Sequence, residues 1–419
     1  MAENTAQSTD LVTIRIPVWW TFGGLIAGLL AGVLLSGSAF LDAILPVVQP
    51  VGALWLRALQ MTIIPLVASL LVLGITQMIA AARAGPVAAW FLALVFGILL
   101  LSALGTVLAM PLLLAAFPVP DSASALLLSG DVEPQQVPEI ADFIASLIAP
   151  NVIAAAAETA TLPLTVFFAV LAVAIARLPD DQRATLIGLF RALANAMLTI
   201  IGWVLWLAPV GVFALALGVA AQAGSGAFAT LAHYILVVSA MGLIVLVLAY
   251  LLALFGGRVG LGRFTRAVLS SQAVAISTQS SLASLPAMLD SSRRLGIRES
   301  VADFVLPLAV AIFRATSPAM NLGVAIYVAH VAGYELTLPA IAAGVAVALV
   351  ISVGSVSLPG SISFVVSIGP IALAMGIPVE PLALLVAVEM LPDIMRTLAN
   401  VTMNVAVTAT VDRHNSVEP

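Results

Sequence analysis

Eight apolar runs, each long enough to cross a lipid bilayer, constrain this chain more than any other feature of its sequence. A spanning helix needs about 20 apolar residues, because the hydrocarbon core is about 30 Å thick. With 62% apolar and 8% charged residues in 419, the chain lies outside the composition of soluble globular proteins. The sequence predicts an all-α integral membrane protein, and several overlong runs predict tilted or broken helices. The runs lie at residues 16–36, 45–79, 86–117, 152–176, 194–221, 228–256, 303–332 and 378–411.

Two further stretches, 265–295 and 339–375, place a centre rich in Ser, Gly and Pro between apolar arms. An irregular backbone leaves unpaired polar groups in lipid, so such a centre enters a membrane only when protein or a cavity surrounds it. The tripeptide Ser-Leu-Pro occurs in both stretches, and each precedes a span with an embedded arginine, Arg314 or Arg396. Helix packing through small residues would also use serine and glycine. The repeated unit favours two re-entrant helical hairpins and the inverted repeats of a secondary transporter.

The arginines predict the topology. The chain contains no lysine, so arginine alone carries the positive-inside signal. If the N-terminal tail is cytoplasmic and both hairpins return to the side they left, only Arg57, Arg314 and Arg396 fall within spans, and the loop at 118–150 is outside and acidic. We therefore predict a multi-pass protein of the plasma (inner) membrane with both termini cytoplasmic. The remaining arginines then lie on or near the cytoplasmic side: Arg15, Arg83, Arg177, Arg183, Arg191, Arg258, Arg263, Arg266, Arg293, Arg294, Arg298 and Arg413.

A polar stripe in the last span is the candidate site. On a helix at about 100° per residue, six polar side chains fall within a stripe roughly 80° wide. A charge at bilayer depth costs about 2.5–3.5 kcal/mol, so such residues face protein or water and mark binding sites. An internal ion pair between Arg396 and Asp393, three residues apart, is the alternative. The stripe comprises Glu389, Asp393, Arg396, Thr397, Asn400 and Asn404.

Other function classes receive little support. The chain has no cysteine, and its three histidines are scattered, so we expect no metal site, cofactor or nucleic-acid partner. Serines are plentiful, but no histidine base is expected near them, which argues against an intramembrane hydrolase and against any enzyme. A channel or a transport-inactive sensor remains open; concentrative counterflow would separate a carrier from a channel.

The C-terminal segment DIMRTLANVTMN resembles the D-x-x-R-T-x-x-N-V-x-x-D motif of the glutamate transporter family, the dicarboxylate/amino acid:cation symporters. STQSSLASLPA, GSVSLPG, APVGVFAL and MTIIPLVASLLVLG also resemble family segments, in the right order. The resemblance covers residues 15–412. It implies a homotrimer whose static scaffold supports a mobile transport domain, which moves as an elevator.

The same resemblance implies a division of the chain. After a cytoplasmic tail at 1–14, it implies scaffold helices 1–2 at 15–80, transport-domain helix 3 at 81–117, scaffold helices 4–5 with the outer loop at 118–227, transport-domain helix 6 at 228–264, hairpin 1 at 265–295, helix 7 at 300–332, hairpin 2 at 339–375 and helix 8 at 378–412.

Residue roles follow from the resemblance in the same way. Arg396 matches the arginine that binds the substrate's side-chain carboxylate, and Asp393 matches the aspartate that binds its amino group. The other matched substrate contacts are Thr397, Asn400 and Ser317, with Ser280, Ser281, Leu358 and Gly360 at the hairpin tips.

The chain departs from the family at its sodium sites. Phe313, Arg314 and Ala315 replace the start of the N-M-D-G-T motif, and Asn404 replaces the last aspartate. Sodium requires hard oxygen ligands, usually with carboxylate charge, so we expect sodium coupling to be lost. Arg314 either stands in for the sodium charge or pairs with Glu389 or Asp303.

Glu389 carries the coupling proton or pairs with an arginine, and the sequence leaves both open. The predicted function is sodium-independent, proton-coupled import of aspartate or glutamate. Arg396 argues against neutral substrates. Asp393 argues against C4-dicarboxylates, because it would repel a dianion that has no ammonium group. A C4-dicarboxylate transporter and a sodium-coupled amino acid symporter are the alternatives.

Overall fold

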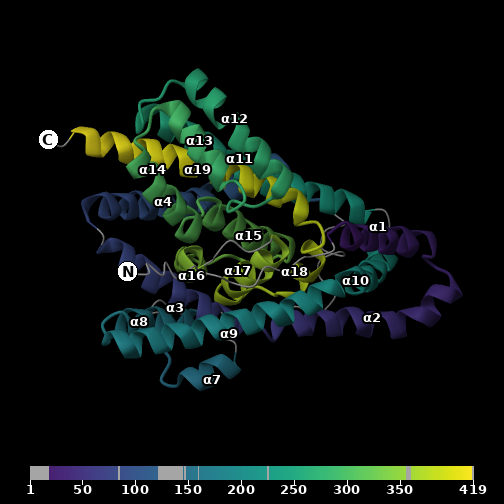
Figure 1. Ribbon diagram of the computed structural model, residues 1–419. Helices are drawn as coiled ribbons and strands as arrows, with labels where there is room; N and C mark the ends of the chain where they lie inside the picture. The colour runs from purple at the N-terminus through teal and green to yellow at the C-terminus, as the bar shows by residue number, and fades with distance from the viewer. Residues whose placement is uncertain are drawn as a thin grey trace.

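The computed structural model describes residues 18–83, 85–120, 145, 148–158, 160–223, 226–354 and 360–417, and all regular secondary structure in them is helical (Figure 1). The predicted tail at 1–14 and most of the outer loop lie outside these residues. The first half contains α1 (Val18–Leu34), α2 (Ala39–Gln60), α3 (Ile63–Ala82), α4 (Pro86–Ala116), α7 (Val152–Ala157), α8 (Thr161–Ile175), α9 (Asp180–Trp206) and α10 (Ala208–Ala223). The second half contains α11 (Gly226–Phe255), α12 (Leu261–Thr278), α13 (Leu285–Leu295), α14 (Glu299–Ile312), the π-helix η1 (Ser317–Asn321), α15 (Leu322–Val331), α16 (Leu338–Gly354), α17 (Gly360–Ala374), α18 (Glu380–Leu385) and α19 (Met390–Val417).

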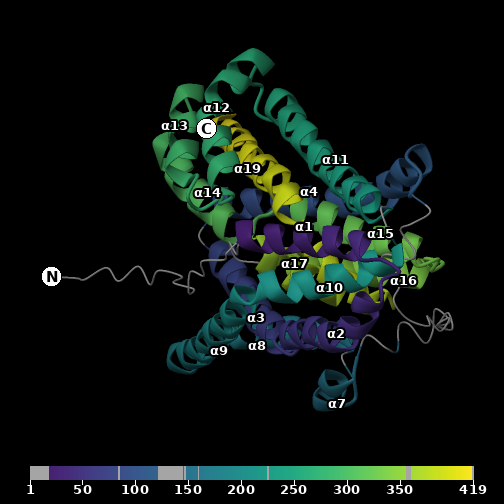
Figure 2. The ribbon, with the colours of Figure 1, turned by 90° about the vertical axis from the view of Figure 1, so that its right-hand side faces the viewer.

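The helices pack in two groups. In one, α1 packs on α10, α10 on α2, and α3 on α8 and α9; in the other, α19 packs on α11, α12, α13 and α14. Figures 1 and 2 show α11–α14 on one side of the molecule and α2, α8 and α9 on the other, with α15 and α17 between them. Helices α16 and α17 contact α3 and α8, so the two groups meet there.

Five helical segments in the described part are long and apolar enough to cross a membrane: Ala39–Ala82, Pro86–Ala116, Asp180–Trp206, Phe228–Phe255 and Glu299–Val331. Each overlaps one of the eight predicted spans. The remaining three predicted spans contain α1, α8, and α18 with α19. The structure therefore has several long apolar helices, while the number of spans and the re-entry of the hairpins stay predictions.

Several predicted spans are interrupted rather than continuous. The run at 45–79 breaks after Gln60, the run at 152–176 divides into α7 and α8, and the run at 194–221 breaks at Leu207. The predicted helices at 300–332 and 378–412 also break, as described below. Helix α9 begins earlier than its apolar run, because Asp180 and Asp181 in its first turn complement the helix dipole.

Both predicted hairpins are pairs of packed helices, α12 with α13 and α16 with α17. In the first pair, α12 ends at Thr278, and its C-cap residue Gln279 adopts the left-handed conformation (φ 49°). Residues 279–284 form the tip of this pair. Pro286 lies in the first turn of α13, so the Ser-Leu-Pro tripeptide begins the second arm. The tip of the second pair, residues 355–359, lies outside the described residues.

Glycines on one face of α1 allow the closest helix contact in the first group. A Cβ atom built on Gly28 would lie 2.6 Å from the carbonyl oxygen of Phe213 in α10 and 2.9 Å from Ala216 Cβ. Gly24 and Gly32, four residues to either side, face α10 equally closely. Small residues at this spacing let two helix backbones approach within a membrane, where packing rather than water drives association.

Replacing Gly28 with alanine should therefore destabilise the protein by about 1–3 kcal/mol, because the backbone of α10 must move to admit a methyl group. Gly23→Ala is the matched control, since nothing lies within 4 Å of a Cβ at that position. Thermal unfolding of both purified variants in detergent would measure the difference. Equal midpoints for the two variants would contradict the close contact.

Candidate functional site

Two interrupted helices meet at the candidate site. Helix α14 ends at Ile312, Phe313 is extended (φ −120°, ψ 120°), and the chain resumes as the π-helix η1 at Ser317. Helix α18 ends at Leu385, and α19 begins at Met390. Pro318 in the first turn of η1 suits a helix start, because proline lacks a backbone N–H. Broken helices present polar groups at a site inside a membrane protein, and π-helical turns often accompany function.

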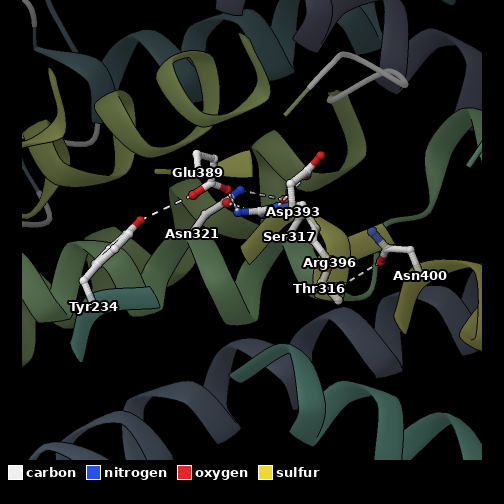
Figure 3. Close-up of polar contacts among 8 residues, drawn as sticks. All are labelled: Tyr234, Thr316, Ser317, Asn321, Glu389, Asp393, Arg396 and Asn400. Atoms are coloured by element: carbon white, nitrogen blue, oxygen red, sulfur yellow. Dashed lines mark hydrogen bonds and ion pairs between the residues drawn. The ribbon is translucent and has the colours of Figure 1, made fainter. Parts of the chain in front are cut away.

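Arg396 of α19 is the centre of the polar contacts (Figure 3). Its Nη2 donates to Glu389 Oε1 over 2.6 Å, and its Nη1 donates to Asn321 Oδ1 over 2.7 Å. Its Nε lies 3.3 Å from Asp393 Oδ1. Glu389 is 0% exposed, and Asp393 and Arg396 are 4% and 5% exposed, so water does not screen these charges. The arginine therefore binds two carboxylates of its own chain.

A second layer of side chains holds these groups in place. Tyr234 of α11 donates its hydroxyl to Glu389 Oε2 over 3.4 Å (Figure 3). Asn321 Nδ2 donates to Ser317 Oγ over 3.1 Å, and Ser352 Oγ of α16 lies 2.9 Å from the same oxygen. Side chains from α11 and from the second helix pair therefore hydrogen-bond the residues around Arg396: Tyr234 bonds Glu389, and Ser352 bonds Ser317, which in turn accepts from Asn321.

The other predicted residues of α19 lie on the same buried face. Asn400 Oδ1 accepts the backbone N–H of Thr316 over 3.0 Å and so ties α19 to the break before η1. Thr397 is also buried. Asn404 is 1% exposed, and among the described residues neither its Oδ1 nor its Nδ2 has a hydrogen-bond partner; the Oγ1 of Thr316 also has none there. A buried, unpaired amide is unusual and calls for a functional explanation.

Arg314 lies in the break itself and is buried. Its charge is attracted by Asp393 and repelled by Arg396, so it interacts with the α19 cluster. Asp393 is thus a carboxylate that acts on Arg314 beside the two that the sequence suggested, and the pairing of Arg314 with Glu389 or Asp303 stays a prediction. Asp303 is exposed on α14.

The structure says less about the predicted substrate contacts at the hairpin tips. Ser280 and Ser281 are in the tip between α12 and α13, where Ser280 Oγ accepts the N–H of Ala283, and among the described residues no hydrogen bond joins this tip to α19. Gly360 is the first residue of α17. Leu358 lies outside the described residues. The structure thus brings together the site residues of the two broken helices, and the place of the hairpin tips in the site stays a prediction.

The buried charges balance. Among the residues whose side-chain burial the structure describes, which leaves out Glu380, only Arg314, Arg396, Glu389 and Asp393 are both charged and buried, and their formal charges sum to zero. In the same part of the chain, no group of three or more histidine, cysteine, aspartate or glutamate side chains could hold a metal ion. A neutral cluster can admit an anion together with one proton without leaving a buried net charge, which would be costly.

Sequence reasoning missed three members of the site. Asn321 lies four residues after Ser317, Ser352 lies in an apolar arm, and Tyr234 lies in an apolar helix. A polar residue isolated in an apolar span was the available signal for each. Which of them would face Arg396 depends on how separate helices pack, and that cannot be counted along one helix.

A buried, charged cluster between two broken membrane helices is typical of secondary transporters. A model of the sodium:dicarboxylate symporter family matches residues 18–414, and the chain belongs to this family. It is a transporter of a multi-pass membrane family and not an enzyme.

Three relatives indicate the range of substrates in related proteins. The chain is 26% identical to the proton/sodium-glutamate symport protein of Bacillus subtilis (strain 168), over 91% of this chain and 89% of the relative. It is 27% identical to the proton/glutamate-aspartate symporter of Escherichia coli (strain K12), over 85% and 82% of the two chains. It is 28% identical to C4-dicarboxylate transport protein 1 of Pseudomonas aeruginosa (strain UCBPP-PA14), over 65% and 60%.

Proposed function

We propose that this protein imports an acidic amino acid, aspartate or glutamate, together with protons and independently of sodium. The observation that carries the proposal is the engagement of Arg396 by Glu389 at 2.6 Å within a cluster of zero formal charge. A guanidinium fork binds carboxylates in two-point geometry, so the substrate's side-chain carboxylate competes with Glu389 for the same donor. Protonation of Glu389 removes the competitor and releases Arg396.

Charge balance favours an amino acid over a C4-dicarboxylate. Aspartate or glutamate carries a net charge of −1, so one proton on Glu389 compensates for it within the buried cluster. The ammonium group of the substrate would face Asp393. A dicarboxylate carries two negative charges and no ammonium group, so one proton leaves a buried charge beside Asp393.

The decisive experiment is uptake into proteoliposomes. Labelled aspartate, glutamate and succinate would be offered under an inward proton gradient and, separately, under an inward sodium gradient. We expect the proton gradient alone to drive accumulation of aspartate or glutamate, with succinate transported poorly. Accumulation that requires sodium would overturn the coupling, and accumulation of succinate alone would overturn the substrate.

A sodium-coupled symporter is the second candidate, and one observation favours it. In the part of the chain that the structure describes, Asn404 Oδ1 and Thr316 Oγ1 are buried oxygens without hydrogen-bond partners, and oxygen is the ligand that sodium requires. Against it, the break contributes a fixed cation, Arg314, where the family motif has a neutral residue, and Ala315 supplies no ligand. We propose that Arg314 provides the positive charge that sodium provides in relatives.

Replacing Arg314 with methionine should then weaken aspartate or glutamate binding about tenfold in sodium-free buffer, the size expected for losing a buried charge interaction. Binding would be measured by calorimetry on the purified protein. Arg298→Met is a matched control, because Arg298 is exposed and pairs with Asp412 far along α19. Unchanged affinity in the Arg314 variant would remove this role.

We further propose that residues 81–117, 228–295, 300–332, 339–375 and 378–412 form a transport domain, which moves as an elevator against a scaffold of residues 15–80 and 118–227 within a homotrimer. The two packing groups of the fold support this division. Gly369 of α17 contacts Ile63 of α3 across the boundary, with 3.3 Å between a built Cβ and Ile63 Cδ1.

A cross-link over this boundary should stop transport reversibly. The chain has no cysteine, so Ile63→Cys with Gly369→Cys introduces one defined pair for a mercury or disulfide bridge. As a control, Ser271→Cys with Ser291→Cys bridges two side chains of the first helix pair whose Oγ atoms are 3.2 Å apart. We expect loss of uptake with the first pair, restored by reductant, and full uptake with the second. Unimpaired uptake in the bridged first pair would contradict movement at this boundary.

A further inference from the structure

A column of ring side chains joins the end of α4 to the buried carboxylate of Glu389. His233 of α11 places its Nε2 2.9 Å from the carbonyl oxygen of Phe117 and its Nδ1 3.1 Å from the hydroxyl of Tyr327 in α15. The ring of Tyr327 meets the ring of Tyr234 edge-on, with 5.5 Å between centroids. Tyr234 then donates its hydroxyl to Glu389 Oε2.

Chemistry fixes the direction of the two histidine hydrogen bonds. The carbonyl of Phe117 only accepts, so the Nε2 of His233 carries a proton and donates. In a neutral imidazole the other nitrogen accepts, and Tyr327 therefore donates its hydroxyl to Nδ1. A charged imidazole donates from both nitrogens, so Tyr327 must turn its own O–H away. Protonation of His233 thus reverses one hydrogen bond in the column.

We infer that His233 is a positioning residue for the proton-carrying carboxylate, an inference that rests on the proposed proton coupling. Neutral His233 fixes Tyr327, and the ring of Tyr327 holds Tyr234 with its hydroxyl on Glu389. A donated hydrogen bond stabilises the ionised form of a carboxylate. Charged His233 releases Tyr327, loosens Tyr234 and so favours protonation of Glu389 and the release of Arg396.

The location of His233 suits this role. It is partly exposed, whereas Tyr327 and Tyr234 are 0% exposed, so in the described part of the chain the histidine is the end of the column that bulk protons can reach. Histidine is the side chain whose charge ordinarily changes between about pH 5 and 8. This end of α11 adjoins the loop that the arginine pattern places outside. External acidification would therefore act on the histidine and on the carboxylate in the same direction.

The surroundings of both ends contain few other charges. Among the described residues, Tyr327 is the titratable group that contacts His233. The groups that face Glu389 and its neighbours are Arg396 and Asp393 from α19, Tyr234 from α11, Tyr327 behind Tyr234 and Arg314 beside Asp393. The column is thus the one contact from Glu389 toward a partly exposed titratable group in the described part of the chain.

The test is the pH profile of substrate exchange, which needs no proton gradient. Proteoliposomes with equal pH on both sides would be assayed for the KM and kcat of aspartate or glutamate counterflow between about pH 5 and 8. Tyr327→Phe keeps the ring but removes the hydroxyl, and His233→Phe removes both hydrogen bonds. Each should lower KM at the alkaline end about fivefold, the effect of one hydrogen bond, and flatten the profile, with kcat changed less. The double variant should match either single variant, because both interrupt the same column.

His330→Phe is the control, since this histidine lies in the last turn of α15 and is exposed. This control should have the same pH profile as the unmodified protein. Every variant should also elute from gel filtration at the same volume and unfold at the same temperature as the unmodified protein. An unchanged profile in His233→Phe, additive effects in the double variant or an equal shift in His330→Phe would each overturn the inference. Proton-driven uptake by the unmodified protein is measured in parallel. If it persists while the profiles do not change, the column fails and the proposed function stands; if it is absent, the proposed function fails.

Discussion

Replacing Arg396 with alanine should reduce the affinity for aspartate or glutamate by about 100-fold or more, the loss expected when one partner of a buried charge pair is removed. Arg396 donates to Glu389 and Asn321 and pairs with Asp393, so its removal leaves two buried carboxylates, of which Asp393 is still attracted by the charge of Arg314. The proposed substrate adds a further carboxylate to that site. Binding to the purified variant would be measured by calorimetry, and uptake in proteoliposomes.

Arg396→Lys separates charge from geometry. Lysine retains the positive charge but lacks the planar fork, so it can replace one of the contacts to Glu389, Asp393 and Asn321 and not all three. We expect this variant to fold and to bind substrate weakly, with an affinity between that of the alanine variant and that of the unmodified protein. If the alanine variant folds and binds aspartate and glutamate normally, Arg396 serves only the internal ion pair, which was the alternative that its sequence spacing allowed.

Helical periodicity predicts a polar stripe along the last span. Its members Asp393, Arg396 and Asn400 are buried in the structure, and the Nε of Arg396 lies 3.3 Å from Asp393 Oδ1, three residues earlier. The same periodicity placed Glu389 on the stripe, and Glu389 directly precedes the first residue of α19. Its carbonyl oxygen accepts the N–H of Asp393 over 2.9 Å, as an N-cap residue does, so its contact with Arg396 two helical turns later agrees with helical spacing.

Contacts between elements were beyond what the sequence could predict. Thr316 meets Asn400 across 84 positions, and Tyr234 meets Glu389 across 155. The first pairing depends on the place where α14 ends, and the apolar run at 303–332 contains no glycine cluster that would have marked the break at Phe313. The second depends on how α11 packs against the start of α19. Tertiary packing decides such positions, because local propensity alone leaves several of them acceptable.

Replacing Glu389 with glutamine should uncouple transport from protons while leaving exchange intact. Glutamine has the shape of glutamate and can still accept from Tyr234, but it carries no charge to compete for Arg396. The cluster of Arg314, Arg396 and Asp393 then has a formal charge of +1, which a monoanionic amino acid neutralises without a proton. We expect KM to become independent of pH and proton-driven accumulation to fall to simple equilibration, a loss of at least about tenfold at an imposed gradient of one pH unit. Accumulation and counterflow in proteoliposomes would measure the two separately.

Two further variants make the result specific to this carboxylate. Glu389→Asp keeps a titratable group one methylene shorter, so it should retain proton-driven accumulation with reduced affinity. Glu335→Gln removes an exposed carboxylate of the described chain and should leave both assays unchanged.

If Glu389→Gln still accumulates substrate under a proton gradient, another group carries the proton. Asp393, the one other buried carboxylate in the described part, would be that group, and Glu389 would serve as a fixed partner of Arg396. Loss of exchange as well as accumulation, in a variant that folds, would instead assign Glu389 to substrate binding itself. The neutral substitution therefore distinguishes a moving proton from a static ion pair, which the burial and the 2.6 Å contact of this carboxylate allow equally.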